Sequence, residues 1–209
     1  MLDVGFASGF ILVVISGSAL ITEMNVMLPE MLLAKRLSLS TLHLGFWATV
    51  LFGNIIGALF VGGLFGLGDV VGPAEYERPS ELIEEKMRFQ EDGVGGWFGA
   101  LASGVAGNWL VGMATFLATA ARTIPEKIMG VLFSVVGFVV LGVQHAPANL
   151  GYFSIAQWHV DVAYGWGEMV WWNLLPALIG NVIGASLLVA ALFWFTHGRG
   201  DLAGEADLA

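Results

Sequence analysis

Long apolar runs without charged residues occupy most of this 209-residue chain. A helix needs about 20 residues to cross a hydrocarbon core of roughly 30 Å. The runs are at least that long, and they cover residues 4–28 (interrupted only by Glu23), 43–68, 93–121, 128–160 and 169–198. We therefore predict an all-α membrane protein, a single transmembrane domain over 1–209 with five spans at about 4–33, 43–68, 97–121, 128–157 and 169–197.

Two of these runs are too long for one straight helix, and both carry polar residues near their middle. The first, counted through Leu33, contains "VVISGSALITEMNV" at 13–26, and the fourth contains "GVQHAPANLG" at 142–151. Helix-breaking glycines and prolines lie in both stretches, including Gly17, Pro29, Gly142 and Pro147. Irregular backbone at membrane depth must be buried in protein or line a wet cavity. We therefore predict two broken helices, interrupted near 19–25 and 144–149, with a transport site between them.

A short motif occurs twice and relates the two halves of the chain. "GNIIGAL" at 53–59 recurs as "GNVIGAS" at 180–186, and each copy follows one of the broken runs. Because the two copies cross the membrane in opposite directions, the pattern indicates an inverted repeat, the architecture of aquaporin-like bundles. The second half holds three spans and the first only two, so symmetry predicts a further span before residue 4. The two breaks should meet at mid-membrane, with His145 within hydrogen-bond reach of Thr22.

Composition supports the membrane class and excludes several others. The chain is 57% hydrophobic and 12% charged, with a mean hydropathy of +0.80, whereas soluble domains carry about 25% charged residues. It has no cysteine, so a disulfide framework or thiolate metal site is excluded. Its four histidines have no metal-ligand spacing, and its eight Lys and Arg form no patch for nucleic acid. We predict no cofactor and no metal.

The placement of charge predicts the orientation. Basic residues follow the first, third and fifth spans, and all fall on one side if the spans alternate: Lys35, Arg36, Arg122, Lys127 and Arg199. That side is cytoplasmic. The multi-pass chain would then lie in the cell (cytoplasmic or inner) membrane with its C-terminus inside. Residues 69–96 would form an acidic extracytoplasmic loop, in which "PSELIEEKMRFQ" is expected to form a surface helix with solvated charges.

Four segments resemble the motifs of the formate/nitrite transporter family, a family of pentameric anion channels with six spans. They are "GSALITEM" at 17–24, "NWLV" at 108–111, "GVQHAPAN" at 142–149 and "NLLPALIGNVIG" at 173–184. The resemblance covers nearly the whole chain, and the last three motifs together are specific. It implies a homopentamer with one pore in each protomer, and five of the family's six spans are present here.

The resemblance also implies roles for individual residues. His145 matches the central pore histidine, and Thr22 matches the threonine that hydrogen-bonds it. Asn149 and Asn181 match pore-lining or site-supporting asparagines. The cytoplasmic constriction corresponds to Leu20 and Ile21, faced by Asn108 and Val111, and the periplasmic constriction to Phe6, Phe10 and Phe138. Asn54, in the first copy of the repeated motif, is expected to support the site.

Three positions depart from the family pattern. Gln144 stands where the family has an acid before the histidine, and Ala19 where it has an acid in the first motif. Glu23 replaces the glycine after the threonine. One carboxylate is thus lost beside the histidine, and another appears in the break that approaches it. We expect Gln144 and Glu23 to support the site. Gln144 should point away from the pore, because adjacent residues of a helix diverge in direction.

The predicted function is a pH-dependent channel or transporter, not an enzyme, for small monovalent anions such as formate or nitrite, with protons as a further partner. Two half-helix N-termini and a histidine would supply positive character between dry apolar rings. Alternatives are an aquaporin-like neutral-solute pore, although paired N-P-A caps are missing, and a non-transporting remnant. An intramembrane protease using Ser16 or Ser18 with His145 lacks the G-x-S-G context.

Each candidate residue also has a plainer interpretation. His145 could be a satisfied core histidine, and Thr22 could bond back to its own helix. Asn54 and Asn181 could only tie helices together, with the neighbouring glycines allowing close approach. The three phenylalanines could face lipid or neighbouring helices.

Overall fold

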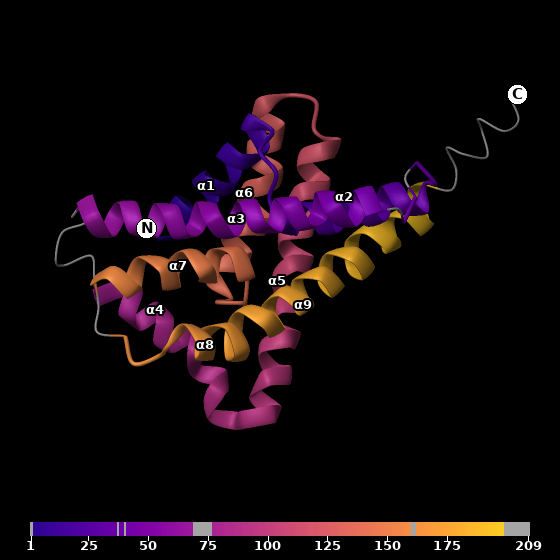
Figure 1. Cartoon of the computed structure of the whole chain (residues 1–209). Coiled ribbons are helices and arrows are strands. Elements are labelled where there is room, and N and C mark those ends of the chain that lie inside the picture. The colour runs from indigo at the N-terminus through magenta and orange to yellow at the C-terminus, as the bar shows by residue number, and fades with distance from the viewer. Residues whose placement is uncertain (1, 37, 40, 69–76, 160–161, 199–209) are drawn as a thin grey trace, which may run out of the picture.

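The computed structural model describes residues 2–36, 38–39, 41–68, 77–159 and 162–198, and every regular element within them is helical (Figure 1). The first half contains α1 (Leu2–Ser16), α2 (Ile21–Leu33) and α3 (Thr41–Gly68). The second contains α4 (Glu77–Met87), the 3₁₀ turn η2 (Arg88–Asp92), α5 (Gly93–Ala120), α6 (Ile124–Val140) and α7 (Ala146–His159). A last near-continuous helix joins α8 (Trp166–Met169), η3 (Val170–Leu174), α9 (Leu175–Ala185), η4 (Ser186–Ala191) and η5 (Trp194–Gly198), where η3 to η5 are π-helical.

Helix breaks separate α1 from α2 and α6 from α7, slightly before the intervals predicted from the polar residues. Gly17 (φ 70°) and Gly142 (φ 60°) adopt the left-handed conformation that favours glycine and ends a helix. The axes of α1 and α2 meet at a bend of 46°. Pro29 lies inside α2 without ending it, and Pro147 is the second residue of α7, where the helix needs no N–H from it. The breaks therefore follow the glycines, and the polar residues open the second half-helices.

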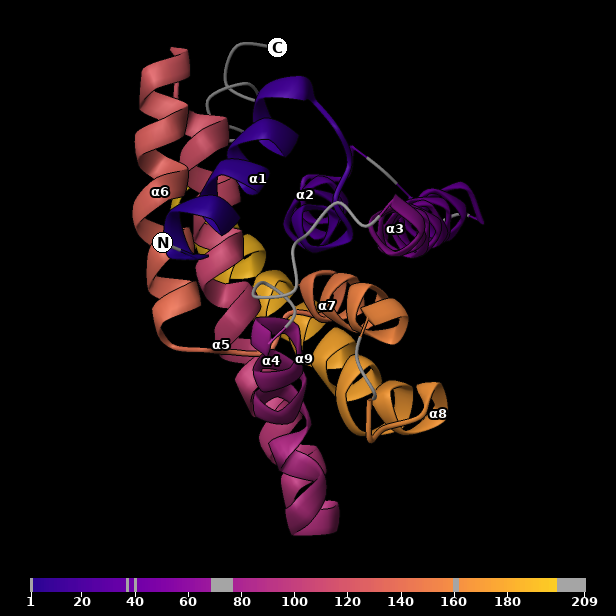
Figure 2. The same ribbon diagram turned by 90° about the vertical axis from the view of Figure 1, so that its left-hand side faces the viewer.

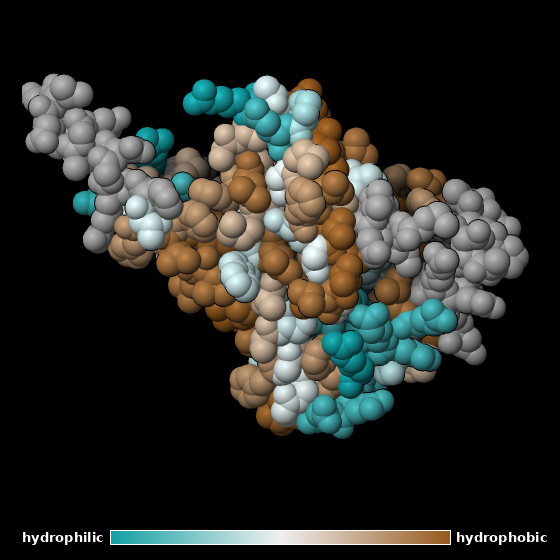
Figure 3. Space-filling model, turned by 180° about the vertical axis from the view of Figure 1, so that it is seen from behind, coloured by the Kyte–Doolittle hydropathy of each residue, from teal (hydrophilic) through white to brown (hydrophobic). Residues whose placement is uncertain are grey.

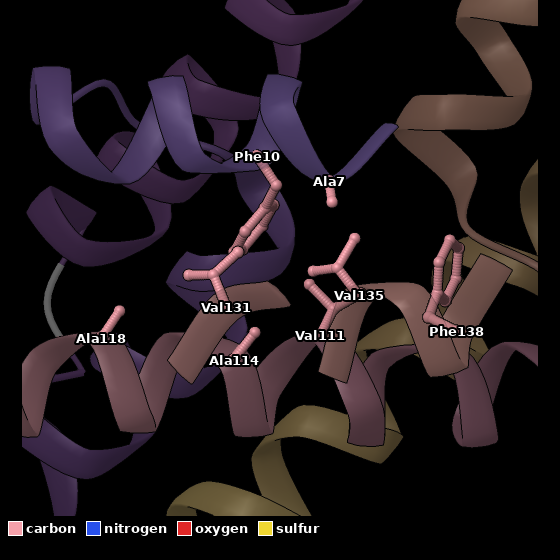
Figure 4. Close-up of a cluster of buried hydrophobic side chains, with 8 residues drawn as sticks. All are labelled: Ala7, Phe10, Val111, Ala114, Ala118, Val131, Val135 and Phe138. Atoms are coloured by element: carbon pink, nitrogen blue, oxygen red, sulfur yellow. The ribbon is translucent and has the colours of Figure 1, made fainter. Parts of the chain in front are cut away.

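The helix α5 is the centre of the packing. It crosses α9 at very close range, because Gly104 and Gly180 lie at the contact and a Cβ on Gly180 would collide with the Leu101 carbonyl. It also packs on α6, which in turn contacts α1. One buried apolar cluster lies where these three helices meet (Figure 4). Its members are Ala7 and Phe10 of α1, Val111, Ala114 and Ala118 of α5, and Val131, Val135 and Phe138 of α6.

The outer surface is largely apolar. In Figure 3, hydrophobic residues cover the middle of the visible face, and hydrophilic ones gather near the α5–α6 connection at one end and near α4 at the other. Among the described residues, three helical segments are long and apolar enough to cross a membrane, or four if α1 and α2 count together. The predicted five spans are therefore not confirmed, because α6 has 17 residues and α7 has 14, each too short to span alone.

The predicted acidic loop at 69–96 contains the helix expected from "PSELIEEKMRFQ", but one face of this helix is buried. Residues 77–92 are helical, and α5 begins at Gly93 instead of 97. Ile83 and Met87 of α4 are buried against Phe153 of α7. Lys86, expected in solvent, is only 6% exposed, because α4 packs its apolar stripe onto α7 and carries this side chain inward with it. Residues 69–76, and Arg199 at the other end, lie outside the described residues.

Candidate pore site between the two helix breaks

The two breaks bring a threonine and a histidine together at the centre of the protein. His145 Nε2 lies 3.1 Å from Thr22 Oγ1, although 123 positions separate the two residues in the chain. Thr22 is fully buried and His145 is 2% exposed. The predicted contact is therefore confirmed, and Thr22 reaches across to the other repeat with its hydroxyl. The second ring nitrogen, His145 Nδ1, is buried without a hydrogen-bond partner in the part of the chain that the structure describes.

The two motif asparagines hold the two breaks in the same way. Asn181 Oδ1 accepts a hydrogen bond from the Ala146 N–H (2.9 Å), and its Nδ2 donates to the Gln144 carbonyl (3.1 Å). Asn54 Oδ1 accepts from the Ile21 N–H (2.8 Å), and its Nδ2 donates to the Ala19 carbonyl (3.1 Å). In each case the amide joins the first N–H of the second half-helix to the carbonyl two residues earlier. The inverted repeat is thus present in individual hydrogen bonds.

This geometry assigns both asparagines a supporting place. Asn181 is fully buried, and its Nδ2 also donates to the Gly104 carbonyl at 2.9 Å, so all its polar atoms are engaged by backbone. Asn181, predicted to line the pore or to support the site, ties α9 to α5 and to the break before α7. Asn54 holds the equivalent position in the first half.

Asn108 of α5 links the two repeats behind the threonine. Its Nδ2 donates to the Asn181 carbonyl (2.7 Å) and the Thr22 carbonyl (3.3 Å). Its Oδ1 is buried and has no partner among the described residues. Asn108 therefore fixes the backbone that presents Thr22 and retains one free acceptor.

A second polar cluster supports His145 from the other side. Asn149 Nδ2 donates to Gln144 Oε1 (2.6 Å) and Asn173 Oδ1 (2.7 Å). Asn173 Nδ2 donates to Gln144 Oε1 (2.9 Å) and to the Lys86 carbonyl (2.7 Å). Gln144 thus points away from Thr22, as the helix geometry predicts. Asn149, predicted to line the pore or to support the site, is turned into this cluster.

Sequence reasoning missed two members of this cluster. The Lys86 ammonium donates to the Gly142 carbonyl at 3.0 Å, so a cation from α4 covers the end of α6. Its position within an acidic segment gave no sign of this contact. Asn173 did carry a signal, because an asparagine in an apolar run is costly to bury unless it is paired. The same argument that selected Asn181 could have found it.

Aromatic rings cover one side of His145. The rings of Phe6 and Phe138 stack with centroids 5.4 Å apart. Both meet His145 edge to face, with centroids 6.4 Å and 5.3 Å away, respectively. Phe10 lies in the α1–α5–α6 cluster beside Val131 (Figure 4). The predicted periplasmic constriction therefore places Phe6 and Phe138 next to the histidine and Phe10 in the cluster beyond them.

Of the residues predicted to form the cytoplasmic constriction, Leu20 and Val111 lie in one cluster and Ile21 lies in another. Leu20 packs against the same apolar cluster that contains Val111. Ile21 is buried elsewhere, with Met24 and with Val50 of α3, because successive residues at the start of a helix point about 100° apart. Ile21 is therefore a core contact between α2 and α3. Glu23 is buried too, and its Oε2 accepts the Leu20 N–H at 3.2 Å, which caps the start of α2.

Known proteins are similar to this chain in sequence. The family model described as "Formate/nitrite transporter" matches residues 1–195. The chain is 33% identical over 197 residues to the uncharacterized transporter YrhG of Bacillus subtilis, covering 94% of this chain and 71% of that one. It is 31% identical to a probable formate transporter of Methanothermobacter thermautotrophicus (92% and 73% covered) and to the formate channel BtFdhC of Bacillus thuringiensis (90% and 70%).

Two solved structures have the same fold. An FNT family ion channel superposes with a TM-score of 0.76 at 22% identity, covering 88% of this chain and 72% of that one. A pentameric formate channel with formate bound gives a TM-score of 0.76 at 20% identity, covering 93% and 81%. Together with the paired breaks and the family match over residues 1–195, these relatives show that the chain belongs to the formate/nitrite transporter family of multi-pass membrane transport proteins.

Proposed function

We propose that this protein conducts small monovalent anions, formate or nitrite among them, through a path that passes between the two helix breaks. The observation that carries the proposal is the buried contact of His145 with Thr22 between the first turns of α2 and α7. The relatives named for formate transport support the same substrate class.

The two half-helices supply positive potential where an anion needs it. Thr22 is the second residue of α2, and His145 directly precedes α7. The N-terminus of a helix carries roughly half a positive charge together with unpaired N–H groups. Two such ends facing one site offset part of the cost of taking an anion out of water. The phenylalanine rings keep water away, which strengthens this attraction.

His145 completes the site as a hydrogen-bond donor. If the Thr22 hydroxyl donates to Nε2, the ring proton resides on Nδ1, the nitrogen that has no partner among the described residues. That N–H can donate to a passing anion, and histidine is the side chain whose ordinary pKa lies nearest to neutral pH. Flux is therefore expected to depend on pH.

In the bilayer, α1 with α2 and α6 with α7 each act as one broken span. Together with α3, α5 and the last helix they make five spans, with the C-terminus in the cytoplasm of a cell-membrane protein. The structural relative titled as a pentamer supports a homopentamer with one path per protomer.

The test is formate uptake into liposomes containing the purified protein, measured between pH 5 and pH 8. We expect pH-dependent formate flux, abolished or reshaped by His145→Phe and unchanged by the control His43→Phe. Equal effects of the two substitutions would overturn the role of His145. Glycerol flux without formate or nitrite flux would instead establish a neutral-solute pore, and no flux of any solute would establish a non-transporting protein.

A further inference from the structure

The helix α2 divides into a buried first half and an outward-facing second half. Residues 21–26 are buried, whereas Glu30 and Met31 are exposed. The first half is fixed against α5, because a Cβ on Gly112 would lie only 3.2 Å from Val26 Cγ2. Figure 2, which looks nearly along α2, shows the last helix running below it in this view, and the segment η4 of that helix packs on α2.

Pro29 leaves one carbonyl group of α2 without its usual partner. In a regular helix the N–H of residue 29 would donate to the Asn25 carbonyl, but proline has no N–H. The hydroxyl of Ser186, the first residue of η4, donates to this carbonyl at 3.0 Å. A helical serine commonly bonds back to a carbonyl of its own helix. Here the hydroxyl is directed at another helix, so Ser186 supplies the bond that Pro29 removes.

Asn25 is firmly anchored, and the residues after it are not. Trp47 Nε1 of α3 donates to Asn25 Oδ1 at 2.9 Å, so Asn25 is held by its side chain as well as by its carbonyl. Residues 27–33 make no hydrogen bond to another helix within the described part of the chain. Sharp bends in helices occur at prolines. The direction of residues 27–33 therefore depends on one joint, formed by Asn25, Pro29 and Ser186.

A cavity of about 230 Å³ lies between this second half of α2 and the last part of α5. Its lining includes Val26, Glu30 and Met31 of α2 and Thr115 and Thr119 of α5. On α2 the cavity begins one helical turn after Thr22, and on α5 it begins one turn after Val111. Thr115 is only 4% exposed, whereas Thr119 is exposed. Thr115 thus lies inside the cavity and Thr119 at its rim.

We propose that residues 27–33 form a lid over this cavity, with its hinge at Asn25 and Pro29, and that Ser186 is the positioning residue that holds the lid closed. The proline removes the bond that would stiffen α2 at the hinge, and the serine ties the hinge to the last helix. The inference rests on the proposed function in one respect: the cavity is a mouth of the anion path beyond Thr22, and the lid controls passage through it.

The accessibility of a thiol inside the cavity tests the lid. The protein has no native cysteine, so Thr115→Cys places a single thiol under the lid, and Thr119→Cys places one at the rim as a reference. Each is treated with a charged, water-soluble methanethiosulfonate reagent in lipid nanodiscs, where both faces meet the solution. We expect Ser186→Ala to raise the modification rate at position 115 by about fivefold, the factor equivalent to one net hydrogen bond, and to leave the rate at position 119 unchanged.

Two further variants separate the hinge from general loosening. Pro29→Ala restores the N–H that α2 lacks, so combining it with Ser186→Ala should return the rate at position 115 to its original value. Ser103→Ala is the matched control, because it removes a hydroxyl that accepts the Gln144 N–H at the other break. No rise with Ser186→Ala, an equal rise with Ser103→Ala, or a rise that Pro29→Ala does not reverse would overturn the proposal.

Formate flux into liposomes is then measured on the same variants. Flux should rise about fivefold with Ser186→Ala and fall back in the double variant, in parallel with the thiol reactivity. A protein that conducts formate but shows no such rise would overturn the placement of the lid on the path. Absence of flux in the unaltered protein would overturn the proposed function and the lid's control of passage, while the thiol rates would still decide whether Ser186 holds a lid closed.

Discussion

The two repeats of this protein use the same backbone device in different surroundings. In both, a glycine with positive φ ends a helix (Gly17 and Gly142), and an asparagine from the motif helix clamps the start of the next one (Asn54 and Asn181). The second break is then enclosed by α5 and by a cluster of amide side chains. The first has a single carboxylate, Glu23, and an exposed outer side.

The difference teaches that a sequence repeat specifies a local geometry but not its environment. The clamp forms in both halves because its two partners lie within one helix break. The cover is supplied by another helix, and only the second half of the described chain has that helix beside it. Perturbing equivalent positions in the two halves should therefore give unequal effects.

The largest inequality is expected at the motif glycines. Gly180→Leu forces a side chain into the backbone of α5 and should destabilise the protein by at least about 3 kcal/mol, or prevent folding. Gly53→Leu meets no neighbour among the described residues and should change stability by less than about 0.5 kcal/mol. Thermal unfolding in detergent, followed by tryptophan fluorescence, measures both. Equal destabilisation would show that the two faces are equally covered.

A smaller inequality is expected at the clamps. Asn181→Leu leaves the Ala146 N–H and the carbonyls of Gln144 and Gly104 without their partner in a buried site, at a cost of roughly 3 kcal/mol or more. Asn54→Leu releases only two groups in a less buried place and should cost about 1–2 kcal/mol. The same unfolding experiment ranks them, and a larger effect at Asn54 would contradict the comparison.

The carboxylate found only in the first break allows a third test. Glu23→Ala removes the acceptor of the Leu20 N–H and should cost about 1 kcal/mol, the usual value of a lost helix cap. Because Leu20 packs into the apolar cluster with Val111, its looser backbone should also raise formate leak in liposomes. Glu23→Gln retains an acceptor and serves as the matched control. If Gln and Ala raise the leak equally, the charge and not the cap is what matters.

The smallest effect is expected at the surface cap of α6. Backbone N–H groups of Arg122 and Thr123 donate to the Glu126 carboxylate and lower its pKa below 4.5. A folded-state pKa below the unfolded one stabilises the fold above the unfolded pKa, and this stabilisation is lost as pH falls through the folded pKa. Glu126→Gln should therefore remove a slight acid sensitivity of unfolding below about pH 4.5 and leave flux unchanged. An altered flux would place this cap in the transport path.

Much of the site follows from the sequence because its signals lie along the chain. Apolar runs predict membrane helices, and an inverted repeat places its two breaks opposite each other. His145 and Thr22 were therefore predicted to meet, and they do. The same reasoning placed Gln144 behind the histidine, because adjacent residues diverge in direction.

Tertiary structure decided the remainder. Lys86 and Asn173 enter the site through the packing of α4 and the last helix, and no spacing along the chain records such an approach. Ile21 packs with Met24 and with Val50 of α3, a contact that depends on how α3 lies beside α2. Most plainly, the motifs "GNIIGAL" and "GNVIGAS" make the same clamp, yet one is buried and one exposed. Side-chain chemistry is carried by each segment, whereas burial depends on which other helix occupies the space beside it.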